Sequence, residues 1–283
     1  MGNIIKKQHY VWRKYLEPWV INDKIWCQRD NKVFSSSLMG VANEAYFYEI
    51  TELNAIEQEI LHLIINQYPK ENRKLILDIL VKINIISKIS DKTRKNGLEN
   101  YYGFMENNAV DLYKKLYVKD LSFINNDFVK SNFYGFLGLQ YTRTKKMLVG
   151  FKNIFEIIPT PEKYKGKFNP DNIYRVIGLI SAESIGNWIY LMGNIYFFDS
   201  DYELITCDQP IINIHASNYD TMKPPKRLEL YYPITPNLAL FITNRKIGNR
   251  ILKKEDANFY NNLMKQRSHE QIYAKTPDLF NIL

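Results

Sequence analysis

The hydrophobic period of this 283-residue chain changes once, near Gly193, and that change constrains the fold more than any short motif. Before it, apolar residues such as Ile56, Ile60 and Ile64 recur at the spacing of one helix face. After it, residues 195–206 alternate with a period of two, as half-buried strands do. We therefore expect an α+β fold, with a helix-rich N-terminal half packed on a small antiparallel sheet formed mainly by the C-terminal part.

Proline and polar caps divide the first part of the chain into separate helices. Helices are predicted over residues 54–68, 70–90, 98–118 and 127–147, and a further long helix begins at Asn169-Pro170 and runs through Trp188. The buried stripe of the second helix is predicted as Leu75, Ile79, Ile83 and Ile86. The polar stretch 91–96 is expected to be a solvated loop.

Strand signals follow Gly193. Residues 195–206 are predicted to form a hairpin that turns at residues 199–201, and residues 211–216, 228–234 and 238–244 are predicted as further strands. A last helix is expected over residues 255–270. The proline-rich stretch 157–170 marks a soft boundary between a mainly helical half, 1–155, and a part with one helix, antiparallel strands and a terminal helix, 170–283. We expect the two parts to fold as one cooperative unit.

The net charge of +8 favours phosphate-bearing partners such as nucleic acid. Enrichment in Lys, Asn and Ile weakens this inference, because the base composition of a gene could produce it. Cys27 and Cys207 are isolated in the sequence, which indicates a reducing compartment. The N-terminus lacks a secretion signal, and no window is apolar over the roughly 18 residues that a membrane span needs. We expect a cytoplasmic protein without membrane contact.

The signatures of the common enzyme classes are missing. The chain has no phosphate-binding glycine loop, no GxSxG elbow, no HExxH, no paired CxxC and no glycine-rich dinucleotide motif. Asp201 and Glu203 are not followed by the lysine of many metal-dependent nucleases. These absences argue against a standard metal nuclease and against enzymes that bind nucleotides through a glycine-rich phosphate-binding loop.

A few isolated side chains could still carry chemistry. The imidazole of His9 could exchange protons near neutral pH or bind a metal, although a half-buried structural histidine is an equal alternative. Asp208 follows a predicted strand and suits a general base or a ligand for a divalent metal; the alternative is a turn in which its carboxylate bonds backbone N–H groups. Glu44 is the acidic candidate associated with His9, or else an exposed residue.

Substrate contacts are predicted from two places. Gln140 and Arg143 lie one helical turn apart and could present an amide and a guanidinium to a phosphate; alternatively they end a solvated helix. Gln8 and Tyr10 flank His9 and are predicted to bind substrate with it. The other histidines are not expected to act: His62 fits a structural position, and His215 and His269 have neither a partner nor a motif.

Four short motifs, in this order, resemble the bacterial domain-of-unknown-function family 4238. They are Gln8-His9-Tyr10-Val11 with Tyr15-Leu16, Gln140-Tyr141-Thr142-Arg143-Thr144, Thr206-Cys207-Asp208-Gln209-Pro210 and Tyr232-Pro233-Ile234-Thr235-Pro236. Trp12 stands where the family usually has proline, and Cys207 and Gln209 also depart from its third motif. The resemblance implies that these positions matter, and it brings no activity with it.

Together the motifs supply an imidazole, an amide, a guanidinium and a carboxylate, which suffice to hydrolyse a phosphodiester. The leading hypothesis is a nucleic-acid-directed hydrolase that acts as a toxin-like or antiviral effector, with its site where the two halves meet. A binding or regulatory protein is the alternative, with Trp12, Tyr15 and Trp19 as an aromatic surface and the polar motif residues locking the halves together. A transferase with a nucleotide donor is a third possibility.

Overall fold

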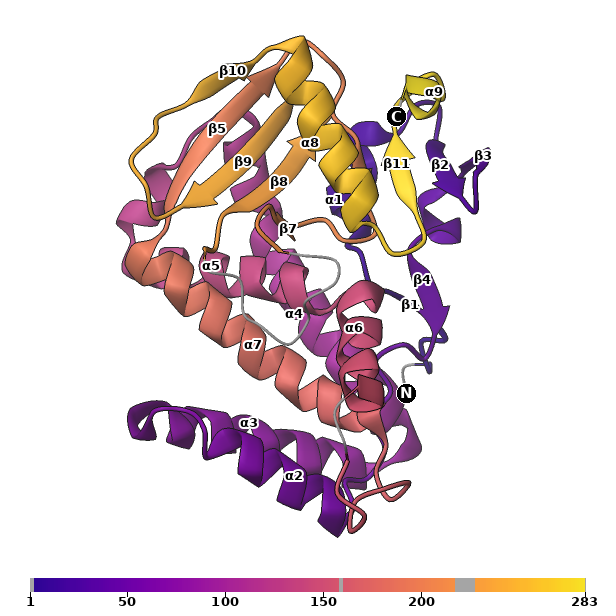
Figure 1. The fold of residues 1–283 in the computed structure, drawn as a ribbon, viewed down its shortest axis with the longest axis vertical. Coiled ribbons are helices and arrows are strands. Elements are labelled where there is room, and N and C mark those ends of the chain that lie inside the picture. The colour runs from indigo at the N-terminus through magenta and orange to yellow at the C-terminus, as the bar shows by residue number, and fades with distance from the viewer. Residues whose placement is uncertain (1–2, 158–159, 217–226, 283) are drawn as a thin grey trace.

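The computed structural model describes residues 3–157, 160–216 and 227–282 and shows a mixed α+β protein, as predicted (Figure 1). Its helices are α1 (Arg13–Leu16), α2 (Ala55–Ile65), α3 (Lys70–Ile89), α4 (Asp91–Tyr117), α5 (Asp127–Thr142), α6 (Lys145–Ile157), α7 (Pro170–Met192), α8 (Lys254–Arg267) and α9 (Leu279–Ile282). Short 3-10 helices occupy Glu17–Trp19, Leu38–Gly40 and Ser122–Asn125.

Polar caps fix where the predicted helices begin. The Asn54 side chain accepts the backbone N–H of Glu57 while the Glu57 carboxylate accepts that of Asn54, a complete capping box before α2. Asn169 caps α7, and Pro170 occupies its first turn, where no N–H is needed. The polar caps in the sequence therefore predicted where α2 and α7 begin.

Helices α5 and α7 form the centre of the helical layer, and two glycines let them approach closely. A Cβ atom at Gly186 would lie 2.9 Å from the carbonyl oxygen of Tyr134, and one at Gly138 would overlap the carbonyl of Ala182. On the far side of α7 from the large sheet lie α2 and α3 (Figure 1).

The larger sheet has the order β10-β5-β9-β8-β7, and all its strands follow Gly193 in the chain, as predicted. The strands are β5 (Asn194–Ser200), β7 (Ile212–Asn213), β8 (Leu230–Thr235), β9 (Leu238–Thr243) and β10 (Arg250–Leu252). All pairs are antiparallel except β10 with β5. Alternation along β8 separates two cores: Tyr232 belongs to the main core, and Tyr231 packs with the residues of α8.

Distant parts of the chain share the second sheet, whose order is β3-β2-β11-β6. Its strands are β2 (Ile25–Arg29), β3 (Lys32–Ser36), β6 (Thr206–Cys207) and β11 (Ile272–Ala274). Strand β11 pairs with β2 on one edge and with β6 on the other. A separate ladder joins β1 (Lys7–His9) to β4 (Asn43–Ala45). The main core correspondingly includes residues from Tyr10 to Tyr273.

Several predicted boundaries were wrong. Residues 91–96 open helix α4, because Ser90 caps it by accepting the N–H of Thr93. The predicted helix 127–147 is two helices, which separate at Arg143 and Thr144. The predicted hairpin does not form: β5 pairs with β9 and β10, and β6 joins the other sheet.

The predicted stripe of α3 was correct except at its first residue. Ile83 is buried and Ile79 and Ile86 pack against the main core, whereas Leu75 is 56% exposed and Ile76 is buried in its place. Apolar residues lie on more than one face of this helix, so the periodicity misplaced one end of the stripe. Within the described residues, no helix combines the length and apolar character needed to cross a membrane.

Candidate functional site

Gln8 in strand β1 is fully buried, and its side chain bonds backbone groups. Its Nε2 donates to the carbonyl of Lys95 at 2.6 Å, and its Oε1 accepts the N–H of Tyr48 at 2.6 Å. The amide thus fastens β1 to helix α4 and to the segment after β4. Its predicted contact with substrate stays a prediction.

His9 follows Gln8 and is half-buried. Its Nε2 is buried and has no hydrogen-bond partner among the described residues. Burial and, to a smaller extent, the nearby charges of Arg13 and Arg143 together lower the pKa of His9 to about 4. The imidazole is therefore neutral at physiological pH and can accept a proton.

Helix α4 carries a carboxyl group of opposite character, Glu99, which lies in the electrostatic surroundings of the same two guanidiniums. Burial raises the pKa of Glu99 to about 7, against the opposing charge of Arg143 and with a smaller contribution from Glu106. Glu99 and Glu106 are two helical turns apart and therefore lie on one side of α4. Near neutral pH a substantial fraction of Glu99 holds its proton.

Arg143 is buried at the C-terminal cap of α5. Its Nη2 lies 2.5 Å from Oε1 of Glu106, and its guanidinium lies over the ring of Tyr102, 5.4 Å from the centroid. Its Nε is buried without a partner among the described residues. Glu106 neutralises this cation, as a buried guanidinium requires.

We give the name His9 cluster to the side chains that surround the charges of Arg13 and Arg143: His9, Arg13, Glu99, Glu106 and Arg143. Arg13 is exposed, so the cluster reaches the surface on that side. All five residues belong to the mainly helical half of the chain. The structure thus brings together two of the predicted residues, His9 and Arg143, and adds three others.

Asp208 lies elsewhere and is fully buried. Its Oδ1 accepts the N–H of His269 at 2.7 Å, and its Oδ2 accepts the N–H groups of Glu270 and Gln271 at 2.7 and 3.0 Å. Burial raises the pKa of Asp208, and these three bonds oppose the shift. The carboxylate holds the loop between α8 and β11 in place.

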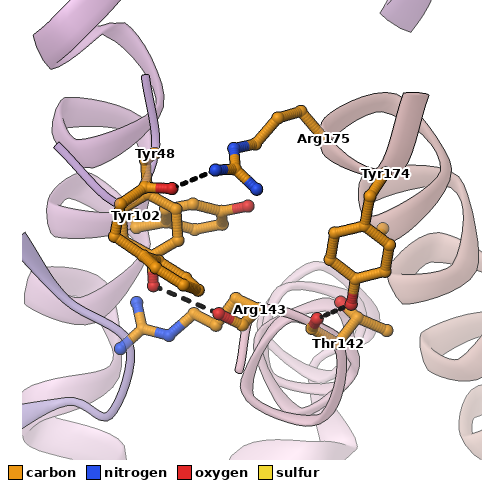
Figure 2. A pocket seen from close by; sticks show the side chains of 8 residues that line it. Tyr48, Tyr102, Thr142, Arg143, Tyr174 and Arg175 are labelled. Atoms are coloured by element: carbon orange, nitrogen blue, oxygen red, sulfur yellow. Dashed lines mark hydrogen bonds between the residues drawn. The ribbon is translucent and has the colours of Figure 1, made fainter. Parts of the chain in front are cut away.

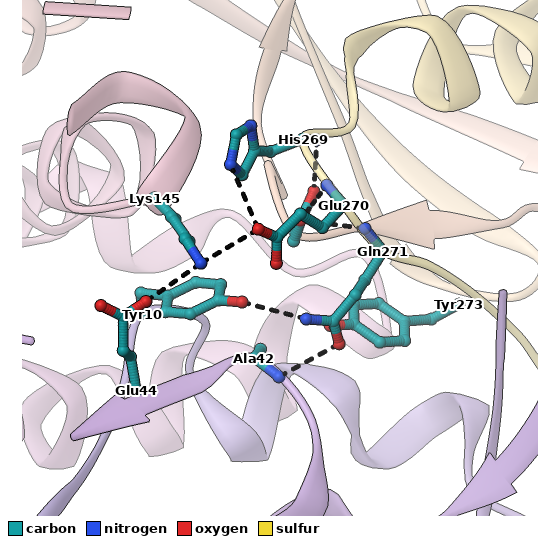
Figure 3. Close-up of polar contacts among 9 residues, drawn as sticks. Tyr10, Ala42, Glu44, Lys145, His269, Glu270, Gln271 and Tyr273 are labelled. Atoms are coloured by element: carbon teal, nitrogen blue, oxygen red, sulfur yellow. Dashed lines mark hydrogen bonds and ion pairs between the residues drawn. The ribbon is translucent and has the colours of Figure 1, made fainter. Parts of the chain in front are cut away.

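The predicted residues Tyr10 and Glu44 meet this same loop (Figure 3). The Tyr10 hydroxyl accepts from Nε2 of Gln271 at 3.0 Å. Lys145 bridges Glu44 and Glu270, at 3.0 Å from each carboxylate. Glu44 is thus an ion-pair partner on the surface beside the Asp208 loop.

The remaining motif residues join segments that are far apart in sequence. The Tyr15 hydroxyl lies 2.5 Å from Oγ1 of Thr206, and the Tyr15 ring stacks on Tyr232. Thr144 donates to the side chain of Gln209. Gln140 is buried in α5, and its Oε1 has no partner among the described residues.

The expected aromatic surface was wrong. Trp12, Tyr15 and Trp19 are buried in the main core, where Trp12 packs edge-on against Tyr113 and Nε1 of Trp19 donates to the carbonyl of Leu204. Large rings with one polar atom fit such positions when that atom finds a partner.

A small cavity lies between α4, α5, α7 and the segment that follows β4 (Figure 2). Of the four residues His9, Gln140, Arg143 and Asp208, only Arg143 lines it. Arg175 of α7 also lines it and was not singled out from the sequence. A lone charge inside the apolar stretch 173–180 was the available signal.

Two further expectations concern histidine partners and metals. His215 has a partner after all, since its Nε2 lies 2.7 Å from Oε2 of Glu229. Nε2 of His269 lies 3.5 Å from Oε1 of Glu270. No group of three or more His, Cys, Asp or Glu side chains suited to a metal ion occurs in the part of the chain that the structure describes.

The structure is that of a mixed α+β protein in which short motifs join segments that are distant in sequence. The His9 cluster lies beside strand β1. The chain belongs to the family described as "Protein of unknown function (DUF4238)", whose model matches residues 7–278. No curated protein matches the chain significantly. No solved structure does so either.

Proposed function

We propose that this protein is a nucleic-acid-directed phosphodiester hydrolase whose chemistry lies in the His9 cluster. The observation that carries the proposal is that an imidazole and a carboxyl group each lie near the charges of Arg13 and Arg143, with pKa values displaced in opposite directions. Such opposed pairs are how one site holds a base and an acid at the same pH. The net charge of +8 adds attraction for a polyanion.

In the proposed reaction, His9 takes the proton of the attacking water as its oxygen bonds to phosphorus. Glu99 gives its proton to the leaving oxygen as the old P–O bond breaks. Arg13 and Arg143 stabilise the charge on the non-bridging oxygens. Asp208 and Glu44 have no step here, because their carboxylates already hold the 269–271 loop and Lys145.

The test is cleavage of labelled single- and double-stranded RNA and DNA by the purified full chain, with EDTA or with added Mg²⁺ or Mn²⁺. His9→Gln and Glu99→Gln should each reduce the rate by roughly 10²- to 10⁴-fold, the usual contribution of a general acid or base. Glu162→Gln is the control, because Glu162 is exposed and pairs only with Lys165 in the described structure.

The pH profile adds a readout that a structural role would not give. The rate should rise with a pKa of about 4 and fall with a pKa of about 7, and Glu99→Gln should abolish the alkaline limb. Intact substrates under all metal conditions would refute the proposal. A toxin-like or antiviral role further predicts that expression arrests growth of a bacterial host and that His9→Gln restores it.

A binding or regulatory protein is the second candidate, and a specific observation favours it. The side chains of Gln8 and Asp208 bond backbone groups within the fold. If all motif residues serve stability alone, the His9→Gln and Glu99→Gln variants will change the melting temperature and no cleavage activity will be found in the wild-type protein.

A further inference from the structure

Arg175 is a buried cation for which the described structure contains no carboxylate partner. Its side chain extends from α7 into the interior, and the residue is 7% exposed. Nη2 donates to the carbonyl of Phe47, and the guanidinium lies over the Phe47 ring, 5.3 Å from its centroid. This is its single hydrogen bond to a described residue, and Nε is buried without one. A guanidinium has five N–H donors, so most of its capacity is unused.

Arg143 shows how the same fold treats a buried guanidinium that is compensated. Glu106 lies 2.5 Å from it. Asp171 is a carboxylate that stabilises the charge of Arg175 from a distance, and it forms its own ion pair with Lys152. An unpaired buried charge costs several kcal/mol, so a compensating anion is expected where space allows one.

The space beside Arg175 is the cavity in Figure 2, whose walls include Tyr48, Tyr102 and Tyr174. Its volume is about 10 Å³, which is room for roughly one water molecule. Tyr174 donates to the carbonyl of Thr142, and Tyr48 bonds the carbonyls of His9 and Arg143. The Tyr102 hydroxyl, by contrast, makes no hydrogen bond to a described residue and is free to donate.

We propose that this cavity binds a small monovalent inorganic anion of about the size of chloride, held by the Arg175 guanidinium and the Tyr102 hydroxyl. Chloride is larger than water but is among the smallest common inorganic anions, whereas a tetrahedral oxyanion such as phosphate is several times larger than the cavity. A water molecule would satisfy N–H groups but would leave the charge uncompensated. Arg143 also lines the cavity, but its guanidinium is paired with Glu106, so the anion site does not depend on the proposed chemistry.

Thermal unfolding of the full chain tests the proposal in sodium gluconate buffer, with chloride or bromide replacing gluconate at constant ionic strength. An anion that binds only the folded state raises Tm by about 2–3 °C at about ten times its Kd. Chloride and bromide should give this saturable rise, and sulfate and phosphate should not.

Two variants locate the effect. Arg175→Gln keeps a donor for the Phe47 carbonyl but removes the charge, and it should abolish the halide response. Tyr102→Phe keeps the ring and should weaken halide binding by roughly three- to tenfold, the value of one hydrogen bond. Arg250→Gln, at an exposed position, should respond like the wild-type protein.

A wild-type protein without a saturable halide response overturns the proposal. So does an unchanged response in Arg175→Gln. If Arg175→Gln does not fold, Tyr102→Phe decides: an unaltered halide affinity in that variant places the anion elsewhere. An equal rise with sulfate in both wild type and variants indicates a general salt effect and also overturns it.

Discussion

Replacing Asp208 with alanine tests whether this motif residue serves the fold. The substitution removes three hydrogen bonds of 2.7, 2.7 and 3.0 Å between a buried carboxylate and the N–H groups of residues 269–271. Bonds to charged groups contribute about 1.5–3 kcal/mol each. Relief of the buried charge and access of water to the partly exposed N–H groups offset part of this sum. We expect a net loss of about 3–5 kcal/mol, as for other buried charged groups that lose a partner.

The assay is thermal and urea unfolding of Asp208→Ala beside Asp201→Ala, a change of the same type at an exposed position. For a chain of this size, a loss of that magnitude lowers Tm by about 5–9 °C. Asp201→Ala should stay within about 0.5 kcal/mol of wild type. If Asp208→Ala melts with the wild-type protein, the loop does not depend on the carboxylate, and its burial would call for a role in chemistry instead.

Three other substitutions probe the His9 cluster and the packing. The folded-state pKa of Glu99, about 7, lies above its ordinary value of 4.5. The contribution of Glu99 to the free energy of unfolding is therefore complete below pH 4.5 and is lost as the pH rises through 7. In urea unfolding, Glu99→Gln should remove about 1–3 kcal/mol of this pH-dependent loss. A uniform offset at all pH values would contradict the assignment. Gly138→Ala forces a Cβ against a carbonyl of α7 and should lower the free energy of unfolding by about 1–3 kcal/mol, measured by thermal unfolding. Its control is Gly103→Ala, which has open space at its Cβ and should be neutral or stabilising. Tyr15→Phe leaves the Thr206 hydroxyl unpaired and should cost about 1–2 kcal/mol of unfolding free energy; an unchanged Tm would show that water replaces the bond.

Local signals in the sequence predicted most of the helices and two of the strands well. The capping box at Asn54 and the Asn169-Pro170 start mark α2 and α7, and the two apolar runs around Pro236 became the paired strands β8 and β9. These features depend on residues within a few positions of one another. Composition and spacing are sufficient for them.

Features that depend on distant partners could not be predicted in this way. Strand β6 resembled the second arm of a hairpin, yet it pairs with β11, more than sixty residues later. The basic residues after Arg143 resembled the end of one helix, but a second helix, α6, begins at Lys145, where the Thr144 hydroxyl accepts the N–H of Met147 and donates to Gln209. Such pairings are selected by tertiary packing, which no short window contains.

The candidate site shows the same division. His9 and Arg143 were predicted, because an imidazole and a guanidinium in recognisable motifs stand out. Glu99 and Glu106 were not, because glutamates spaced along a helix normally face water. Their burial follows from the way β1 and the end of α5 cover α4.

The position of β11 in the second sheet has a consequence for how the chain folds during synthesis. Strand β2 is made early, but its inner neighbour, Ile272–Ala274, is made about 240 residues later. Until then β2 and β3 form an isolated hairpin, which is marginally stable by itself. The sheet position of β2 and β3 therefore depends on the synthesis of β11. A nascent chain stalled before residue 272 should leave β2 and β3 sensitive to protease.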